Sequence, residues 1–248
     1  MVSLEGKVGI VTGASSGIGH ATALAMAQQG VRVVAAARRQ QQLDQLVEEI
    51  QADGGEALAV PCDVTDWSQV DTLVQTALGR YGTVDILVAN AGVGILGPLV
   101  HGNPADWKLA LETNILSVLY SIKAAVPPML EKGSGDVVIL SSIAGRGAGS
   151  PFGVYAATKH ALTAIGNTLR QEVGRQGIRV TLVEPGGVST EFIQSSIYNL
   201  APGQASPFDG VSFTRLEPAD IARAVVYIVQ QPANVSVNEI TIKPTQQV

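Results

Sequence analysis

Tyr155 and Lys159 stand four residues apart in the stretch Tyr-Ala-Ala-Thr-Lys, so on a helix they share one face. A phenol has an ordinary pKa of about 10, too high for ready proton exchange at neutral pH. A neighbouring ammonium favours the phenolate and lowers that pKa. The pair therefore predicts a side chain that donates a proton in one reaction direction and accepts it in the other. A Tyr-x3-Lys pair also occurs on ordinary surface helices.

Two further polar residues lie within reach of this chemistry. Ser142 follows the apolar stretch Val137–Leu140, and its hydroxyl can hydrogen-bond a substrate oxygen and fix its position. Asn114 lies in the mostly apolar helical pattern 107–130, which we expect Pro127-Pro128 to interrupt. A buried amide left unpaired costs roughly 1–3 kcal/mol, so Asn114 by itself is more readily a packing or kink residue.

Residues 12–19, Thr-Gly-Ala-Ser-Ser-Gly-Ile-Gly, form a glycine turn between an apolar stretch and the helical pattern 18–29. Gly13 permits a tight turn, and Gly17 and Gly19 let the backbone approach a ligand closely. The amino end of the helix offers free N–H groups and a partial positive charge to phosphates. The arrangement favours dinucleotide binding over a plain strand–helix connection.

The second apolar stretch ends at Ala37, about 20 residues past the glycine turn, where enzymes that use NAD commonly place a carboxylate. Arg38 and Arg39 follow and precede the predicted helix Gln41–Ile50. Cations at a helix amino end oppose its dipole by ~0.3–1 kcal/mol, and a 2′-phosphate would justify them. We therefore predict NADP(H) over NAD(H), the alternative being two solvated arginines.

Other polar residues follow later strands. Asp63 can accept a hydrogen bond from an adenine amino group, or it can cap the helix that begins near Asp66, and both interpretations stay open. Asn90-Ala91-Gly92 brings small residues that leave room for a flat cofactor. Cys62 is the only cysteine, which excludes an internal disulfide, and we predict that it is a core residue. No metal site is predicted.

Strand and helix patterns alternate along the whole chain, which predicts one α/β domain over residues 1–248. Most strand candidates are continuous apolar runs, as expected when helices cover both faces of a parallel sheet. These candidates are Val8–Val11, Val31–Ala37, Ala57–Val60, Ile86–Ala89, Val137–Leu140, Val180–Val183 and Ile240–Ile242.

Charged residues make up only 15% of the 248 residues, against about 25% in a typical soluble domain. The low fraction, with the apolar 107–130 pattern, predicts hidden surface and subunit contacts. The net charge is −5 without a basic run, which argues against nucleic-acid or membrane partners. The beginning lacks a signal-peptide layout, and no uninterrupted apolar run reaches membrane-spanning length, so we expect a soluble cytoplasmic protein.

The motifs occur in one order along residues 5–243: the 12–19 turn, Asp63, Asn90–Gly92, Asn114, Ser142, Tyr155 and Lys159, then Pro185-Gly186. In this order the chain resembles the short-chain dehydrogenase/reductase family. The resemblance implies a single-domain Rossmann fold with a seven-stranded parallel sheet in the order 3-2-1-4-5-6-7. It also implies a homotetramer, or a homodimer, that acts on a small carbonyl or alcohol substrate.

The resemblance assigns roles to matching positions. Tyr155 is the expected acid/base, Lys159 tunes it and holds the nicotinamide ribose, and Ser142 orients the substrate. Asn114 matches the residue that holds a relay water, and an Arg after the second strand is common in NADP-using members. The expected cofactor-binding residues are Gly13, Ser15, Ser16, Gly17, Ile18, Gly19, Arg38, Arg39, Asp63 (adenine), Val64, Asn90 (structural), Ala91, Gly92, Tyr155, Lys159, Pro185, Gly186, Val188 and Thr190 (nicotinamide carboxamide).

The chain departs from the family pattern in three places. Ala89 replaces the first Asn of Asn-Asn-Ala-Gly, and Ser16 stands where many NADP-using members carry a basic residue, so 2′-phosphate binding would rest on Arg38 and Arg39. The ending from Asn238 lacks the Asp-Gly-Gly common in 3-oxoacyl-carrier-protein reductases. It resembles the branch of clavulanate-type and small hydroxy-acid dehydrogenases.

Residues 187–215 combine large apolar side chains with Pro, Gly and Ser, which favours a substrate lid over a helical hairpin that completes the core. Few charges there suggest an apolar ketone or aldehyde. A Pro near the start of Glu217–Asp220 predicts the final helix. The predicted substrate pocket comprises Gly94, Ile95, Ser142, Ile143, Ala144, Phe152, Gly187 and Phe192.

The expected function is NADP(H)-dependent hydride transfer between nicotinamide and a carbonyl or secondary alcohol. Three alternatives stay open: a nucleotide-bound regulator without turnover, a reductase of the 3-oxoacyl-carrier-protein type, and another reaction on the same fold, such as dehydration or epimerisation.

Overall fold

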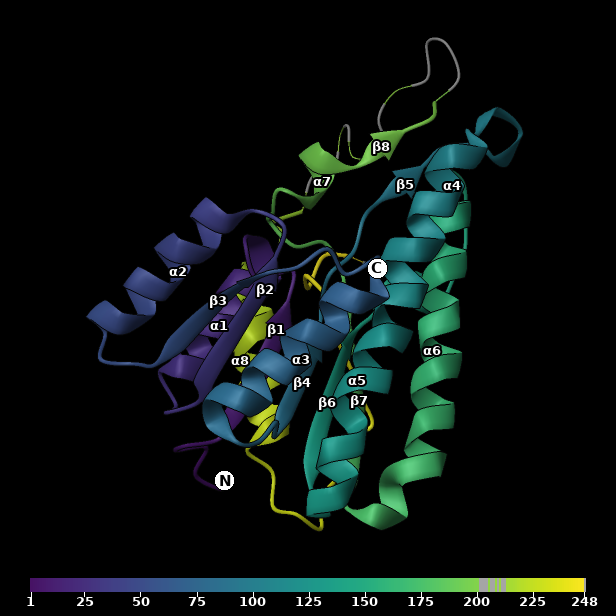
Figure 1. The fold of residues 1–248 in the computed structure, drawn as a ribbon. Coiled ribbons are helices and arrows are strands. Elements are labelled where there is room, and N and C mark those ends of the chain that lie inside the picture. The colour runs from purple at the N-terminus through teal and green to yellow at the C-terminus, as the bar shows by residue number, and fades with distance from the viewer. Residues whose placement is uncertain (201–204, 206–207, 209, 211–212, 248) are drawn as a thin grey trace.

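A seven-stranded parallel sheet forms the centre of the computed structural model, which describes residues 1–200, 205, 208, 210 and 213–247. The strand order is β3-β2-β1-β4-β6-β7-β9, which confirms the predicted 3-2-1-4-5-6-7 order of the seven main strands (Figure 1). The strands are β1 (Val8–Thr12), β2 (Arg32–Ala37), β3 (Ala57–Pro61), β4 (Ile86–Ala89), β6 (Gly135–Leu140), β7 (Ile178–Pro185) and β9 (Glu239–Ile242).

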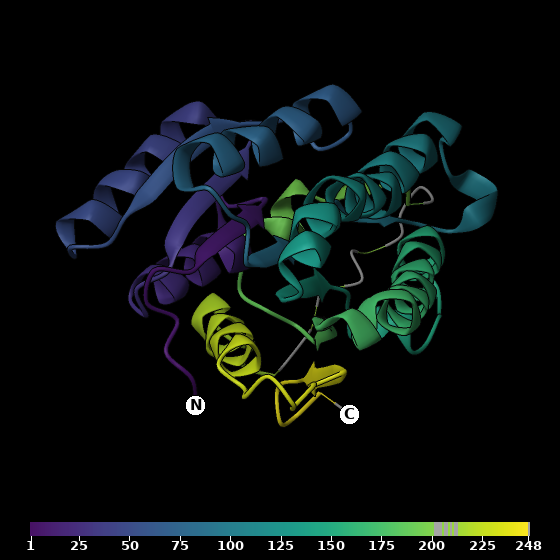
Figure 2. The same ribbon diagram turned by 60° about the horizontal axis from the view of Figure 1, so that its bottom comes forward.

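Helices cover both faces of the sheet (Figures 1 and 2). In β6, Val137 and Ile139 belong to one buried apolar cluster, and Val138 and Leu140 belong to the other. Because successive side chains of a strand point to opposite faces, both faces need apolar residues, and this explains the continuous runs in the sequence. One face packs on α1 (Gly17–Ala27), α2 (Gln40–Ala52) and α8 (Pro218–Val229), the other on α3 (Trp67–Tyr81), α5 (Ser117–Lys132) and α6 (Gly153–Val173).

Local signals set several helix ends. The Asp66 carboxylate accepts a hydrogen bond from the Ser68 amide at 2.8 Å and caps α3. The final helix, α8, begins at Pro218, as predicted from the Pro near its start, and Glu217 and Asp220 form a capping box there. Helices α3 and α5 end at Gly82 and Gly133, whose φ angles of 76° and 74° favour glycine.

The 104–132 run is one helical column in three parts: α4 (Pro104–Leu111), a π-helical turn η2 (Glu112–Leu116) and α5. The expected interruption at Pro127-Pro128 is wrong, because α5 continues to Lys132. The neighbouring Val126 and Met129 are buried in the core, which holds the helix through the two prolines. By length and composition this column could span a membrane, and half of its most apolar window is buried inside the fold, as in a core helix.

A second, two-stranded sheet lies above the carboxyl edge of the main sheet (Figure 1). It pairs β5 (Ile95–Leu96) with β8 (Ile197–Tyr198), which follows the short helix α7 (Phe192–Ser195). The described part of the predicted lid is thus neither a structureless loop nor a helical hairpin. Residues 201–204, 206–207, 209 and 211–212 of that prediction lie outside the described residues. Three short 3-10 turns, η1 (Leu99–His101), η3 (Ile143–Gly145) and η4 (Gly174–Gln176), complete the elements of the described chain.

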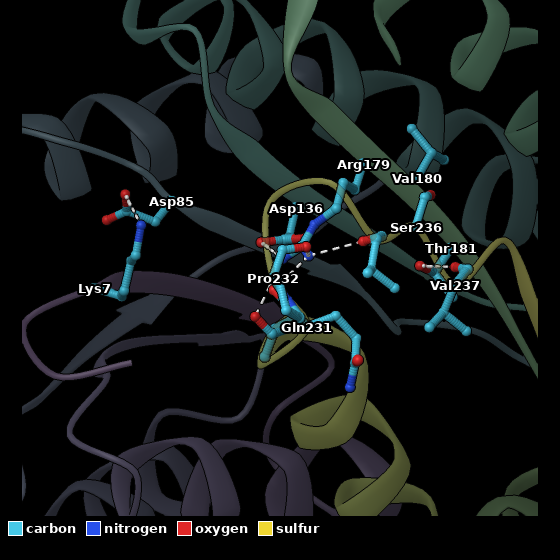
Figure 3. A network of polar contacts seen from close by, with 12 residues as sticks. Lys7, Asp85, Asp136, Arg179, Val180, Thr181, Gln231, Pro232, Ser236 and Val237 are labelled. Atoms are coloured by element: carbon cyan, nitrogen blue, oxygen red, sulfur yellow. Dashed lines mark hydrogen bonds and ion pairs between the residues drawn. The ribbon is translucent and has the colours of Figure 1, made fainter. Parts of the chain in front are cut away.

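At the opposite, amino edge of the sheet, charged residues join strands and helix (Figure 3). Arg179 of β7 binds both carboxylate oxygens of Asp136 in β6, at 2.6 and 3.0 Å. The same guanidinium donates to the carbonyl of Val229, the last residue of α8, and to three carbonyls after it. Nearby, Asp85 accepts hydrogen bonds from the Val8 amide and from Lys132. These contacts stabilise the amino edge of the sheet, and none of them involves residues at its carboxyl edge.

Candidate active site

A cleft of about 840 Å³ runs along the carboxyl edge of the main sheet. Its walls come from the ends of the main-sheet strands β1, β2, β3, β4, β6 and β7 and from the α7 segment, so residues far apart in the sequence meet there. Ligands of open parallel sheets bind at this edge. Most of the sequence-predicted site residues line the cleft, from Arg38 and Asp63 at one end to Phe152 and Phe192 at the other.

The glycine turn forms the floor near the first strand. Gly13 and Gly17 have φ angles of 66° and 55°, a region that other residues rarely adopt. A Cβ on Gly13 would lie 2.8 Å from the Asn90 amide nitrogen, so a larger residue would displace that side chain. The Ser16 side chain does not cap α1, and the first turn of α1 carries no carboxylate. The amino end of α1 therefore keeps N–H groups available for an anion.

Asn90 holds the turn to β4. Its amide nitrogen donates to the Thr12 carbonyl at 2.8 Å, and its backbone N–H donates to the Thr12 hydroxyl at 3.0 Å. The Asn90 side chain therefore donates to the backbone of the glycine turn, which is the kind of structural contact expected from its place after a strand. The small residues Ala91 and Gly92 after it line the cleft.

Both arginines line the cleft at the end of β2 but differ in their partners. Arg39 donates to the Ser15 hydroxyl from two nitrogens, at 3.1 and 3.0 Å, and to the Glu191 carboxylate at 3.2 Å. The Arg38 side chain is exposed and makes no hydrogen bond or ion pair with the described residues.

Asp63 does not cap α3, because Asp66 does. One carboxylate oxygen of Asp63 accepts hydrogen bonds from the Thr65 amide and hydroxyl, at 3.0 and 2.8 Å. The other has no protein donor among the described residues, and it lies in the cleft wall where an adenine amino group could reach it. The capping interpretation of Asp63 is therefore wrong, and the adenine contact stays a prediction.

Ser142, Tyr155 and Lys159 converge in the middle of the cleft. Ser142 caps η3 shortly after the end of β6, and its hydroxyl accepts a hydrogen bond from the Ala144 amide at 3.1 Å. Tyr155 and Lys159 lie one turn apart near the start of α6, with the Lys159 ammonium 5.6 Å from the centre of the Tyr155 ring. Ser142 also hydrogen-bonds the Tyr155 phenol.

Burial sets the acidity of both titratable groups. It raises the pKa of Tyr155 to about 12, and the hydrogen bond with Ser142 opposes this increase. Burial lowers the pKa of Lys159 from 10.5 to about 8. Lys159 is 6% exposed, and its ammonium donates to the Leu140 carbonyl at 2.9 Å, its only hydrogen-bond partner in the described chain. An ammonium has three donors, so two remain for a ligand.

Asn114 lies in η2, behind the cleft wall. Its side chain accepts a hydrogen bond from the Val93 amide at 2.8 Å and donates to the Val93 carbonyl and the Thr158 hydroxyl. Thr158 donates in turn to the Tyr155 carbonyl at 2.7 Å. Asn114 therefore connects the loop after β4 to the turn of α6 that carries Tyr155.

Four predicted site residues do not line the cleft: Gly19, Asn114, Gly94 and Ile95. Gly19 packs against the Gly13 carbonyl and the Asn90 side chain. Gly94 lies beneath Ser196 and Phe192, and Ile95 is buried in β5, where it pairs with Ile197. Each supports the wall from behind.

The structure adds cleft residues that sequence reasoning did not assign to the site. These include Leu109 and Thr113, whereas Ile193, Ile197 and Phe208, which also line the cleft, lie within the predicted lid 187–215. Leu109 and Thr113 belong to the helical column 104–132, whose mostly apolar sequence did not show which of its side chains face the cleft. Gln247, near the chain end, accepts a hydrogen bond from the Gly187 amide at 2.8 Å, a contact that no local pattern signals.

The sequence pattern of the short chain dehydrogenase family matches residues 7–199. An uncharacterized oxidoreductase of Staphylococcus haemolyticus is 39% identical over 244 residues, covering 98% of this chain and all of that protein. A glycine betaine reductase of Emericella nidulans is 40% identical over 97% of this chain, which spans only 19% of that longer protein. An alcohol dehydrogenase from Thermococcus sibiricus, solved with 5-hydroxy-NADP, superposes with a TM-score of 0.86 at 30% identity, covering 98% of both chains.

The fold and the cleft define an α/β protein with a dinucleotide-type site. With the match over residues 7–199, the chain belongs to the short-chain dehydrogenase/reductase family of NAD(P)-binding oxidoreductases, which act on small molecules.

Proposed function

We propose that the protein is an NADP(H)-dependent reductase of an apolar ketone or aldehyde, working in reverse as an alcohol dehydrogenase. The observation that carries this proposal is the convergence of Ser142, Tyr155 and Lys159 in one cleft with the glycine turn and Arg38. The similar alcohol dehydrogenase, solved with an NADP derivative, supports the same class of reaction.

The residues present fit a nicotinamide dinucleotide. The uncapped amino end of α1 suits its pyrophosphate, and the Asp63 carboxylate suits the adenine. The two unused donors of Lys159 suit ribose hydroxyls, and Val188 and Thr190 line the cleft where we propose that the carboxamide binds. When bound, the reduced nicotinamide supplies a hydride to the carbonyl carbon.

The chain's own residues handle the proton. Ser142 holds the substrate oxygen next to the Tyr155 phenol. Because burial keeps the pKa of Tyr155 at about 12, the phenol is protonated at neutral pH and can donate to the developing alkoxide. In the reverse direction it must lose that proton first, and the positive charges of Lys159 and of an oxidised nicotinamide favour that loss.

The far end of the cleft selects for apolar groups. The Tyr155 and Phe192 rings lie with their centres 5.5 Å apart, and the Phe152 and Phe208 rings lie 5.9 Å apart. Around these rings the charged cleft residues of the described chain are Lys159, in the middle of the cleft, and Glu191, which is paired with Arg39. A neutral, apolar substrate suits this lining better than a phosphorylated one.

A cofactor assay with a substituted Tyr155 tests the proposal. NADPH absorbance is followed with a panel of ketones, aldehydes and hydroxy acids. Tyr155→Phe should lower turnover by about 10²–10⁴-fold, because the general acid is lost, and should leave NADPH binding nearly unchanged. Binding without oxidation in the wild-type protein would indicate a regulator, and product formation without net cofactor change would indicate another reaction. Turnover that survives Tyr155→Phe would place the acid elsewhere.

The cofactor preference has its own test. Arg38 is the cation at the end of β2 that has no partner among the described residues, so Arg38→Ala should weaken NADPH binding by about tenfold or more, since hydrogen bonds to charged groups contribute about 1.5–3 kcal/mol. NADH binding should change little, because NADH has no 2′-phosphate. Dissociation constants from cofactor fluorescence measure both effects. Equal losses for both cofactors would contradict a 2′-phosphate site at Arg38.

We also propose a homo-oligomer, with the family's homotetramer as the expected state, in the cytoplasm. Leu111, Leu116 and Leu119 are exposed on the α4–η2–α5 column and support a subunit contact on that face.

A further inference from the structure

We propose that Glu191 sets the strength of NADP(H) binding by competing with the cofactor's 2′-phosphate for Arg39. The inference rests on the proposed NADP(H) preference and names a residue that no family motif assigns to it. It follows from three observations on the cleft walls.

The two arginines after β2 are adjacent in the chain and line the same end of the cleft, yet they are not equivalent. Arg38 is free of partners among the described residues, whereas Arg39 is held by Ser15 and Glu191. A phosphate that binds at Arg38 therefore lies next to a guanidinium already shared with a carboxylate.

The contact with Glu191 comes from the other wall of the cleft. Ser15 belongs to the glycine turn, whereas Glu191 follows β7 and immediately precedes α7, 152 residues away from Arg39. The two walls also touch at Gly17, where a Cβ would lie 3.1 Å from the Thr190 methyl group. The position of Glu191 next to Thr190 thus keeps its carboxylate within reach of Arg39.

The ion pair is weak enough to be displaced. The side chains of Arg39 and Glu191 are 43% and 62% exposed, and their closest atoms, Nη1 and Oε2, are 3.2 Å apart. Exposed pairs of this kind contribute little to stability, because solvent screens the two charges. A phosphate dianion carries more charge than a carboxylate and has three acceptor oxygens, so it can draw Arg39 away at a small cost.

The physical consequence differs between the two cofactors. For NADPH, the single contact between Arg39 and the Glu191 carboxylate is lost or shared when the phosphate binds, and the negative charge of Glu191 then repels the phosphate. For NADH, the Arg39–Glu191 pair stays intact, because the ribose hydroxyl brings no charge. Glu191 therefore weakens NADPH binding selectively, which keeps release of this cofactor fast.

The test measures dissociation constants of NADPH and NADH by cofactor fluorescence at low salt. Glu191→Gln keeps the shape and removes the charge, so it should tighten NADPH binding by about two- to fivefold, the range that an exposed ion pair allows. NADH binding should stay within error. Glu48→Gln is the matched control, because Glu48 lies exposed on α2 outside the cleft and carries the same charge.

A second pair of variants tests the part played by Arg39. In an Arg39→Gln background, Glu191→Gln should increase NADPH affinity clearly less than it does in the protein that keeps Arg39. In the protein that keeps Arg39, added salt should reduce the increase in affinity caused by Glu191→Gln. An unchanged NADPH affinity in Glu191→Gln, an equal gain for NADH, or a full gain without Arg39 would each overturn the proposal. Failure of the wild-type protein to bind NADPH would instead contradict the proposed function.

Discussion

Opposing influences act on the pKa of Tyr155, and the structure shows which of them is larger. The sequence places an ammonium one helical turn away, which predicts a lowered pKa. The folded chain by itself raises that pKa to about 12, because burial outweighs the hydrogen bond with Ser142. The same burial lowers the pKa of Lys159. Motif spacing therefore predicts which residues meet but not their acidities, since burial depends on elements distant in the sequence.

Lys159 gives a prediction of pH-dependent stability. Its pKa is about 8 in the folded protein and 10.5 ordinarily, so between these values the unfolded chain binds more protons. The contribution of Lys159 to the free energy of unfolding therefore increases as the pH rises through this window. Lys159→Met removes that dependence. We expect the wild-type protein to gain about 2–3 kcal/mol over Lys159→Met between pH 7 and 10, at about 1.4 kcal/mol per pKa unit.

Urea unfolding of both proteins at several pH values measures this difference. Lys108→Met, on the exposed side of α4, is the control and should show no such trend. A constant difference between wild type and Lys159→Met across this range would show that burial does not perturb the ammonium.

At the scale of elements, the main strands follow from the apolar runs, and all seven predicted strands are present. The Pro near the start of α8 likewise predicted that helix, and α3 begins near Asp66 as expected, although Asp66 and not Asp63 caps it. The pattern did not predict the π-helical turn η2 or the β5–β8 pair. Strands of two residues have no periodicity to detect, and η2 depends on where Asn114 finds partners in Val93 and Thr158.

Arg179 gives the prediction for element packing, because it ties β6 and β7 to the end of α8 (Figure 3). Arg179→Met leaves the Asp136 carboxylate without its guanidinium partner and leaves several backbone carbonyls without that donor. The side chains of Arg179 and Asp136 are only 15% and 16% exposed. We expect the free energy of unfolding to fall by about 2–4 kcal/mol, as for other broken, mostly buried pairs. Denaturant unfolding measures the loss.

The exposed Arg175 provides the matched control for this variant, and Arg175→Met should have little effect. Replacing both partners, in Arg179→Met with Asp136→Leu, should recover part of the loss, since no charge is then left buried. A stability of Arg179→Met within about 0.5 kcal/mol of the wild type would contradict the assigned role.

For the whole molecule, the order of motifs along the chain was enough to predict the fold and the family, and the match over residues 7–199 confirms both. The end of the cleft that we propose for the cofactor is built from strand ends, so its residues could be predicted from the positions of the strands. The substrate end is built from the helical column, α7 and the chain end, which meet only in the folded state. Leu109 and Gln247 could not be found there from sequence alone.

The charged network at the amino edge of the sheet lies across the whole length of the strands from the cleft. Residues that anchor the scaffold are therefore not those that face a substrate. A laboratory that wished to redirect the specificity of this protein could randomise Leu109, Ile193 and Ile197 together while the amino edge continues to hold the sheet. Variant libraries limited to those positions should retain a high proportion of folded members.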